Sequence, residues 1–403
     1  MAAPNPPPPA AGGPRLYDSL RRQVAPFDGT SRQARIYVCG VTPYDTTHLG
    51  HAFTYLVFDV LGRNLRRHGY AVTYVQNVTD VDDDLLRRAR RDRRDWRELA
   101  AENVAIFRDD LAALHIQPPD HYPWASQEIP GMLELIGRLL EQGIAYRSGG
   151  NVYFRVQRFR RYGELSGFSR AEMLEISRER GADPDDPRKE DPLDFILWQQ
   201  SAPDEPSWET PWGAGRPGWH VECSAMSYRY LGPRLDIHGG GGDLIYPHHE
   251  SEIAQSESFT GQRPFARFWV HTGMLRYEGE KMSKSLGNMV FVRDLRSRYS
   301  ADAIRLTLLG HHYRESFEYH DVDQEGGREL ADRLVTAVRV GVAGEADPAV
   351  DGLLARGLGA LDDDLDTPAA IGVLRELTDR PPSAARRRAL TELGAALGLN
   401  LDG

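Results

Sequence analysis

The stretch from Ile36 to Thr54, which reads IYVCGVTPYDTTHLGHAFT, constrains the fold of this chain more than any other part of its sequence. It begins with a short run of β-forming residues, breaks at Gly40, and continues into an apolar-periodic segment from Ala52 to about Leu65. Strand, glycine turn, polar loop and helix is the order in which α/β proteins bind a ligand at the carboxyl end of a strand. Because a helix amino terminus offers free N–H groups and partial positive charge, the stretch predicts an anion-binding crevice there.

The polar loop of this stretch contains an HxGH motif, from His48 to His51. Gly50 allows a ligand to approach the backbone closely, and two histidines three positions apart meet on one helical face. Four residues alone are also compatible with a simple capped helix start, so the motif needs a partner elsewhere in the chain.

A second strand is predicted from Ala71 to Gln76, and the polar cluster Asn77 to Asp83 follows it directly. The spacing suits a β-α-β unit with a right-handed crossover, which would bring this cluster to the same crevice. No glycine-bearing calcium loop accompanies the aspartates, so we interpret them as turn and helix-cap groups. Further helices are predicted at Trp96–Leu114, Ile129–Gln142 and Ala171–Arg180, and a strand at 194–198.

The lysines of this chain are concentrated in one pentapeptide, Lys281-Met282-Ser283-Lys284-Ser285. The chain has only three lysines, and the third is Lys189. Where arginine has replaced nearly every lysine, a retained pair suggests that a compact ammonium donor is required. The alternative is a solvated loop after Gly279.

An HxGH motif followed far downstream by KMSKS resembles the paired signature of class I aminoacyl-tRNA synthetases. The resemblance implies an α/β fold with a Rossmann-type parallel sheet, a connective insertion and a C-terminal helical domain. It also implies joining of an amino-acid carboxylate to the α-phosphate of ATP with release of diphosphate. The implied catalytic residues are His48, His51, Lys281 and Lys284.

Two cysteines, Cys39 and Cys223, lie in the segments that would border the crevice, as do His248 and Glu252. The last two are four positions apart, so on a helix they share one face. Thiolates and an imidazole at tetrahedral spacing suit zinc. Two inert buried thiols and a core histidine remain the alternative from spacing alone.

Residues 36–54, 193–255 and 281–288 resemble cysteinyl-tRNA synthetase and its relative, the mycothiol-pathway cysteine ligase. This resemblance implies that Cys39, Cys223 and His248 bind one Zn²⁺, with Glu252 as a possible fourth ligand. A zinc with an open position can take the thiolate of L-cysteine and so reject serine, which removes the need for an editing site. Mg²⁺ is expected to accompany ATP.

By the same resemblance, a set of residues around the crevice is expected to line the site for ATP and cysteinyl-adenylate. Trp219 in this set is expected to offer a flat face to a ring, although a core tryptophan is the alternative. The set comprises Cys39, Gly40, Val41, Thr42, Thr54, Asn77, Val78, Thr79, Trp219, Gly241, Gly242, Asp243, Leu275 and Lys284.

The two relatives differ in what attacks the adenylate: the amine of glucosaminyl-inositol in the ligase, or a tRNA ribose hydroxyl in the synthetase. The loop order Thr-Pro-Tyr-Asp with Leu49, the segment ERGADP at 179–184, and the 115 residues after Asn288 resemble the ligase. The run Glu250–Ser256 resembles the synthetase. We therefore expect glucosaminyl-inositol as the acceptor and not tRNA, with cysteinyl-tRNA synthetase as the alternative and a non-catalytic cysteine- or zinc-binding paralogue as a second one.

Composition completes the expected organisation. A disordered proline-rich tail is expected at 1–15, a Rossmann-type core at 16–298 with the insertion at about 115–192, and a helical bundle at 299–403. The tail lacks the apolar core of a signal peptide and no apolar run is long enough to span a membrane, so a cytoplasmic monomer is expected.

With a net charge of −10, the chain shows no overall basic face for a polyanion, and the arginine-rich run at 87–94 is interpreted as a solvated, partly self-neutralised helix face. Four consecutive glycines at 239–242 are expected to interrupt secondary structure.

Replacing Lys284 with alanine is expected to slow cysteine activation by about a hundredfold or more while ATP binding changes little, because the charge that its ammonium would neutralise develops mainly in the transition state. Single-turnover formation of the adenylate and the Kd for ATP measure the two effects separately. Lys189→Ala is the matched control, and equal losses in rate and in ATP affinity would contradict the assignment.

Overall fold

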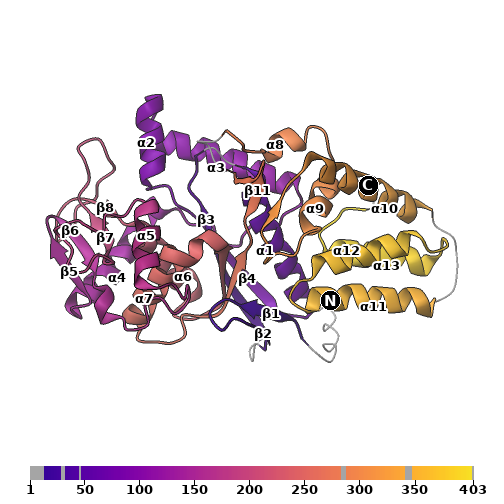
Figure 1. The fold of residues 1–403 in the computed structure, drawn as a ribbon, viewed down its shortest axis with the longest axis horizontal. Helices are drawn as coiled ribbons and strands as arrows, with labels where there is room; N and C mark the ends of the chain where they lie inside the picture. The colour runs from indigo at the N-terminus through magenta and orange to yellow at the C-terminus, as the bar shows by residue number, and fades with distance from the viewer. Residues whose placement is uncertain (1–12, 29–31, 45–46, 283–286, 341–346, 402–403) are drawn as a thin grey trace, which may run out of the picture.

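The computed structural model describes residues 13–28, 32–44, 47–282, 287–340 and 347–401 of the chain. Its centre is a four-stranded parallel sheet in the order β10-β9-β3-β4 (Figure 1). The strands are β3 (Gln33–Val41), β4 (Ala71–Val78), β9 (Leu235–Gly241) and β10 (Ala266–Thr272). Strand order reverses between β3 and β9, and in such sheets ligands bind where the order reverses, beyond the carboxyl ends of the strands.

Helix α1 (Leu49–Arg67) connects β3 to β4, as the spacing predicted. Side chains of β3 alternate between the two faces of the sheet, because successive residues of a strand point in opposite directions. Ile36 and Val38 pack in the core that contains α1, whereas Tyr37 and Cys39 pack in the core on the other face. This alternation directs the Cys39 thiol away from α1.

Two further helices follow β4, namely α2 (Asp83–Asp92) and α3 (Trp96–Ala113). Asp82 caps α2 by accepting hydrogen bonds from the N–H groups of Asp84 and Leu85, which confirms the reading of these aspartates as cap groups. After α3 the chain returns beside β4, through parallel bridges from Val75 to His121 and from Val78 to Trp124.

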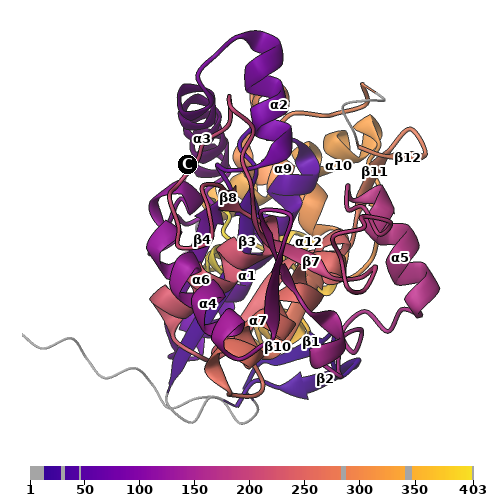
Figure 2. The same cartoon turned by 90° about the vertical axis from the view of Figure 1, so that its left-hand side faces the viewer.

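A second, antiparallel sheet lies at one end of the molecule, in the order β5-β6-β7-β8 (Figures 1 and 2). Its two last strands lie beyond residue 192, the limit expected for the insertion, so this sheet extends to Pro217. Its strands and the helical segments around it are β5 (Ala145–Ser148), β6 (Asn151–Phe154), β7 (Phe195–Gln199), β8 (Arg216–Pro217), η1 (Ala125–Gln127), α4 (Ile129–Glu141), η2 (Val156–Arg158) and α5 (Arg170–Glu179).

Helices α6 (Trp219–Leu231) and α7 (Glu250–Thr260) pack against each other and against α4, on the Cys39 side of the sheet. Between β9 and α7 the chain forms two short turns, η3 (Gly242–Leu244) and η4 (Ile245–His249). A hairpin of β1 (Arg15–Asp18) and β2 (Gln23–Pro26) borders β10, so the last residue of the tail expected at 1–15 is part of a strand. Residues 1–12 lie outside the described residues.

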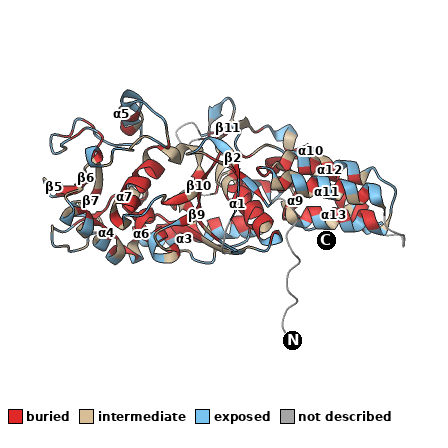
Figure 3. Ribbon diagram, turned by 90° about the horizontal axis from the view of Figure 1, so that it is seen from below, coloured by how far each residue is buried: buried red, intermediate tan, exposed pale blue. Residues whose placement is uncertain are grey.

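The helical end of the molecule lies opposite the antiparallel sheet, and its helices turn their buried sides toward one another (Figure 3). Three short strands and a short helix connect it to the core, namely β11 (Leu275–Tyr277), β12 (Glu280–Lys281), β13 (Phe317–Glu318) and α8 (Val292–Leu295). The helices are α9 (Ala301–Leu309), α10 (Asp321–Arg339), α11 (Pro348–Asp362), α12 (Thr367–Thr378) and α13 (Ala384–Ala396). No helix among the described residues is long and apolar enough to cross a membrane.

The expectation that the glycine run would interrupt secondary structure is wrong for three of its four members, because Gly239, Gly240 and Gly241 belong to β9. The run serves close packing instead. A Cβ atom on Gly239 would lie 2.1 Å from the Phe58 ring of α1 and 3.0 Å from the carbonyl oxygen of Val270. Only glycine lets α1 and β10 approach this strand so closely.

A fully buried ion pair fastens the helical end to the part of the molecule that contains the parallel sheet. Arg305 of α9 donates to the carboxylate of Asp59 in α1 at 2.7 Å, and both side chains are inaccessible to solvent. The same guanidinium also donates to the carbonyl oxygens of Leu114 and Leu397, at 2.8 and 2.5 Å. Every hydrogen bond of this arginine therefore ties together segments that are distant in the sequence.

Replacing Arg305 with alanine is expected to lower the free energy of unfolding by about 3–5 kcal/mol, because the buried Asp59 carboxylate loses one of its two arginine partners, Arg63 being the other, and because the buried carbonyl oxygens of Leu114 and Leu397 lose their donor. Urea denaturation followed by circular dichroism measures the loss. The control is Arg333→Ala, which removes an exposed pair with Asp379 and should cost at most about 1 kcal/mol. Equal stabilities of the two variants would contradict this role for Arg305.

Candidate active site and metal centre

Cys39 reaches its position through an irregularity in β3. The register between β3 and β4 shifts between Val38 and Val41, which is a β-bulge at Cys39–Gly40. A Cβ atom on Gly40 would lie 1.5 Å from the carbonyl oxygen of Asn77, so only glycine fits there. The Gly40 N–H donates to the Asn77 side chain at 2.8 Å, and the hydroxyl of Tyr55 donates to the Cys39 carbonyl at 3.0 Å.

Cys223 on α6 and the start of α7 complete a compact group of metal-binding atoms around Cys39. One ligand atom from each of Cys39, Cys223, His248 and Glu252 lies within 4.8 Å of the others. The two sulfur atoms are 3.8 Å apart, and His248 Nε2 lies 3.2 Å from Glu252 Oε1. The structure thus brings together all four residues that the sequence predicted as metal ligands, including the possible fourth.

A second group of donors overlaps the first and consists of Cys39, His238, His249 and Glu252. His249 Nε2 lies 3.3 Å from Cys39 Sγ, and His238 Nε2 lies 2.9 Å from Glu252 Oε2. Cys223 belongs only to the group that contains His248. The set with both sulfur atoms is therefore the one that matches the sequence prediction.

Burial makes charge costly at this cluster. It raises the pKa of the Cys39 thiol well above its usual value, and Cys223 beside it adds to this rise. Burial likewise raises the pKa of Glu252 and lowers the pKa of His248 well below the usual range. All four groups are 5% exposed or less, so their ionised forms need a strong counter-charge.

These donors fit a divalent metal ion. Two thiols, an imidazole and a carboxylate are the ligand types that zinc binds with tetrahedral geometry. His248 Nε2 is buried and has no hydrogen-bond partner among the described residues, although the Glu252 carboxylate is close to it. Two adjacent lone-pair donors that do not bond to each other are the arrangement expected of ligands that converge on one cation.

The HxGH motif forms the start of α1. His48 is the N-cap residue, and its Nδ1 accepts a hydrogen bond from the His51 N–H. The two imidazole rings stack with centroids 3.7 Å apart, and Gly50 leaves room for them, since a Cβ atom there would lie 3.0 Å from the His48 ring. The structure therefore places both histidines together at the amino terminus of the helix.

The chain that follows the KMSKS segment pairs with this loop. The Leu49 N–H donates to the Val290 carbonyl at 2.9 Å, the Val292 N–H donates to the Thr47 carbonyl at 3.0 Å, and His48 forms a bridge with Phe291. Lys281 belongs to β12, which pairs with β11 through Arg276. Lys284 lies outside the described residues.

The other residues expected to line the adenylate site lie along the carboxyl edge of the sheet. Cys39 to Thr42 end β3, Asn77 to Thr79 end β4, and Gly241 to Asp243 end β9. Thr54 of α1 shares a hydrogen bond with Thr272 at the end of β10, with 2.9 Å between their hydroxyl oxygens. Trp219 begins α6 and stacks on His248 with 4.2 Å between ring centroids, and Leu275 is buried in β11.

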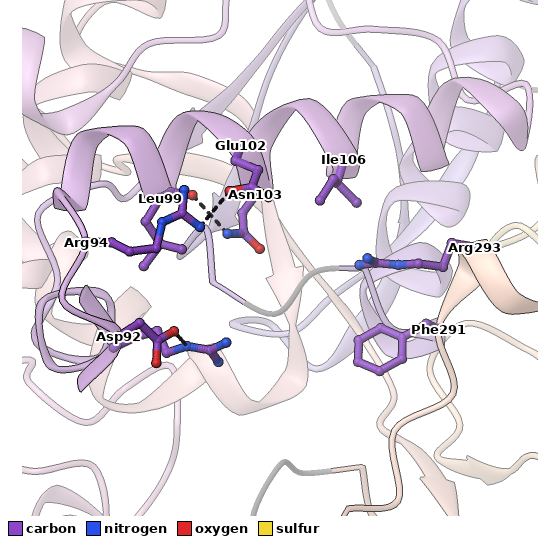
Figure 4. Close-up of a pocket in the computed structure, with 9 residues that line it drawn as sticks. Asp92, Arg94, Leu99, Glu102, Asn103, Ile106, Phe291 and Arg293 are labelled. Carbon is purple, nitrogen blue, oxygen red and sulfur yellow. Dashed lines mark hydrogen bonds and ion pairs between the residues drawn. The ribbon is translucent and has the colours of Figure 1, made fainter. Parts of the chain in front are cut away.

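A polar cavity of about 300 Å³ lies beside Phe291, between α3 and the start of α8 (Figure 4). Figure 4 shows Arg94 of the basic run paired with Glu102. Arg88 of the same run pairs with Asp92. This pairing confirms the interpretation of the run as a partly self-neutralised helix face.

Sequence reasoning missed the histidines that surround the metal cluster. His249 Nδ1 lies 2.8 Å from His271 Nε2, and His271 Nδ1 lies 2.7 Å from the Ser19 hydroxyl. On the other side, His220 Nδ1 lies 3.0 Å from His248 Nδ1. Burial lowers the pKa of His271 to about 3, so this ring is neutral at physiological pH. A concentration of histidine in strands and helix starts after residue 215 was the available signal.

Comparison with known proteins gives concordant matches. The family model described as tRNA synthetases class I (C) catalytic domain matches residues 27–327. The L-cysteine:1D-myo-inositol 2-amino-2-deoxy-alpha-D-glucopyranoside ligase of Thermobispora bispora is 48% identical over 373 residues, which cover 91% of this chain and 90% of that protein. A cysteine–tRNA ligase of Dehalococcoides mccartyi is 44% identical over 403 residues, which cover 96% of this chain and 86% of that protein.

Among solved structures, Mycobacterium tuberculosis methionyl-tRNA synthetase in complex with methionyl-adenylate superposes with a TM-score of 0.63 at 18% identity. The match covers 90% of this chain and 88% of that one, and it confirms the predicted fold. The histidine-capped helix α1 begins at the switch point of the sheet, and the sulfur atoms of β3 and α6 meet on the opposite face. Both features agree with both kinds of match. The chain therefore belongs to the class I tRNA synthetase (C) family, which includes both the cysteine–tRNA ligases and the cysteine:glucosaminyl-inositol ligases.

Proposed function

We propose that this chain is an ATP-dependent, AMP-forming ligase that activates L-cysteine to cysteinyl-adenylate and transfers it to the amine of glucosaminyl-inositol. The observation that carries this proposal is the meeting of Cys39 and Cys223, 3.8 Å apart, beside the crevice that the HxGH helix begins. A thiol-selective site next to a site for nucleotide phosphates is what cysteine activation requires. The product, Cys-GlcN-Ins, is the intermediate expected in mycothiol biosynthesis.

Cys39, Cys223 and His248 are proposed to hold one Zn²⁺ and to leave one coordination position open, with the Glu252 carboxylate beside it as a possible fourth ligand. When bound, zinc supplies a site for the substrate's thiolate, for which the hydroxyl of serine is a poor ligand. Around it, Trp219 stacks on the His248 ring, and His220 contacts the same ring from the side. These contacts fix the orientation of the imidazole, which neighbouring groups must do if the ligand geometry is to be kept.

Activation itself is proposed to depend on positioning and charge. ATP, with Mg²⁺, would lie along the carboxyl edge of the sheet, with its phosphates at the amino terminus of α1 beside His48 and His51. Lys281 and Lys284 would neutralise the charge that develops at the α-phosphate. The carboxylate oxygen of cysteine bonds to that phosphorus, and diphosphate leaves with the electron pair of the broken bond.

In the second step the neutral amine of the acceptor attacks the cysteinyl carbonyl carbon. An amide bond forms, the bond from this carbon to the phosphate oxygen breaks, and AMP leaves with the electron pair. The nitrogen loses one proton to solvent. Asn77, whose side chain accepts from Gly40 and donates to Thr79, holds the ends of β3 and β4 in register beneath this reaction.

We further propose a catalytic core at 16–298 and a helical bundle at 299–403, acting as a cytoplasmic monomer. The antiparallel sheet supports an insertion that ends after β8 and not at about 192. Cysteinyl-tRNA synthetase remains the second candidate function, and the match to the Dehalococcoides cysteine–tRNA ligase favours it. The two candidates share the adenylate and differ only in the acceptor.

Replacing Cys223 with serine is expected to remove bound zinc and to reduce cysteine-dependent ATP–diphosphate exchange by at least about a hundredfold, because losing a thiolate weakens both the metal site and its contact with substrate. Elemental analysis and the exchange assay measure the two effects. Ser227→Ala, one turn further along α6, is the control for general disturbance of the helix. A Cys223→Ser variant that keeps its zinc and its exchange activity would refute the metal site.

Given ATP, L-cysteine and both acceptors separately, the purified chain is expected to couple cysteine to glucosaminyl-inositol and to leave tRNA uncharged. Mass spectrometry detects the amide, and acid precipitation detects charged tRNA. Charging of tRNA without amide formation would establish the second candidate. Absence of cysteine-dependent exchange with ATP would instead indicate a binding protein without catalysis.

A further inference from the structure

A cavity of about 500 Å³ opens beside the carboxyl end of β9, separate from the metal centre. It lies between the β1–β2 hairpin, the end of α5 and the turns η3 and η4, and Figure 2 shows α5 and the hairpin on the same side of the molecule. This volume is within the range of about 300–1,000 Å³ that small-molecule sites occupy. None of the steps proposed above uses it.

The cavity shares a wall with the proposed adenylate site. Asp243 lines the cavity and is also one of the residues expected to contact the adenylate. Arg180 at the end of α5 lies against it, with its guanidinium 3.5 Å from the Asp243 carboxylate and 3.4 Å from the Asp243 carbonyl oxygen. The ERGADP segment, which otherwise has no role in the site, thus connects the cavity to the reacting end of the crevice.

The lining combines aromatic rings with hydrogen-bonding groups. Tyr17, Phe168 and Tyr246 contribute rings, and Phe168 is 37% exposed although it is a large apolar side chain. Glu179 contributes a carboxylate that has no hydrogen-bond or ion-pair partner within the described ranges. Flat apolar faces beside the Glu179 carboxylate suit a ring that carries several hydroxyl groups, since a carboxylate accepts two or more hydrogen bonds.

The charges of the lining exclude a polyanion as the natural occupant. Two arginines face two acidic residues, so they balance: Arg22, Arg180, Glu179 and Asp243. A surface for the phosphates of nucleic acid needs a clear excess of positive charge. A neutral polyol needs no such excess of positive charge.

We propose that this cavity binds the polyhydroxylated part of the acceptor and presents its amine, past Asp243, to the cysteinyl carbonyl. The inference rests on the proposed function and deepens it, because it assigns the acceptor to a site formed by α5 and the hairpin. Glu179 accepts hydrogen bonds from acceptor hydroxyls, and Phe168 packs against a ring face. Neither residue contacts ATP or cysteine in this arrangement.

The test uses full-length protein and the matched pair Glu179→Gln and Glu175→Gln, which change the same residue type one turn apart on α5. Glu175 is exposed and does not line the cavity. Glu179→Gln is expected to raise the KM for glucosaminyl-inositol about tenfold, the loss typical of one hydrogen bond to a charged group, whereas Glu175→Gln leaves it unchanged. A second variant, Ile176→Trp, fills the cavity and should raise the same KM.

Cysteine-dependent ATP–diphosphate exchange, which needs no acceptor, is measured on each variant and should keep the KM values for ATP and cysteine. If the unmodified chain forms the amide but neither Glu179→Gln nor Ile176→Trp changes the acceptor's KM, the cavity assignment is overturned and the proposed function stands. If the unmodified chain performs the exchange but never uses glucosaminyl-inositol, the proposed function and the cavity assignment both fail.

Discussion

The structure depends on the burial of four ionisable groups from three distant parts of the chain in one dry space. Cys39, Cys223, His248 and Glu252 come from a strand, two helices and the turn before the second helix, and no arginine or lysine among the described residues pairs with the Glu252 carboxylate. A core can tolerate such a cluster only if the groups stay neutral or share a cation. The rest of the site follows from this constraint, because the bulge in β3, the glycine at its tip and the close contact of α6 with α7 all place donors around one point.

The two signature motifs form one unit, although about 230 residues separate them in the sequence. Backbone hydrogen bonds join Thr47 and Leu49 to the segment just after KMSKS. The carboxyl end of the KMSKS segment is therefore followed directly by chain that is fixed to the helix start of the HxGH motif. If the two motifs act on one nucleotide, as proposed, these backbone bonds are what holds their positions relative to each other.

Much of this could be predicted from the sequence. Periodicity located α1, α3, α4, α5 and the strands β4 and β7 to within a few residues. Residue types and spacing alone left the candidate metal ligands open, and the family resemblance named Cys39, Cys223 and His248, with Glu252 as a possible fourth. The remaining features of the fold and of the site depend on how distant parts of the chain pack together. Glycines 239–241 look like a loop to any local rule, yet they form a strand, in which Phe58 leaves no room for a side chain at Gly239 and Leu244 leaves little at Gly240. His238 and His249 escaped notice because their role depends on Glu252 and Cys39, which only the folded sheet brings within reach.

Arg305 makes the helical bundle part of the structure of the sheet domain, in addition to the packing within the bundle itself. Its guanidinium donates hydrogen bonds to Asp59 of α1, to the Leu114 carbonyl just after α3 and to the Leu397 carbonyl just after α13. An arginine sealed from water in this way cannot lose one acceptor without a large cost. The bundle is consequently not a detachable module: removing its last helix together with Leu397 would take one acceptor from this guanidinium, and grafting another C-terminal domain onto this core would also take the Arg305 partner from Asp59 in the helix that carries the HxGH motif.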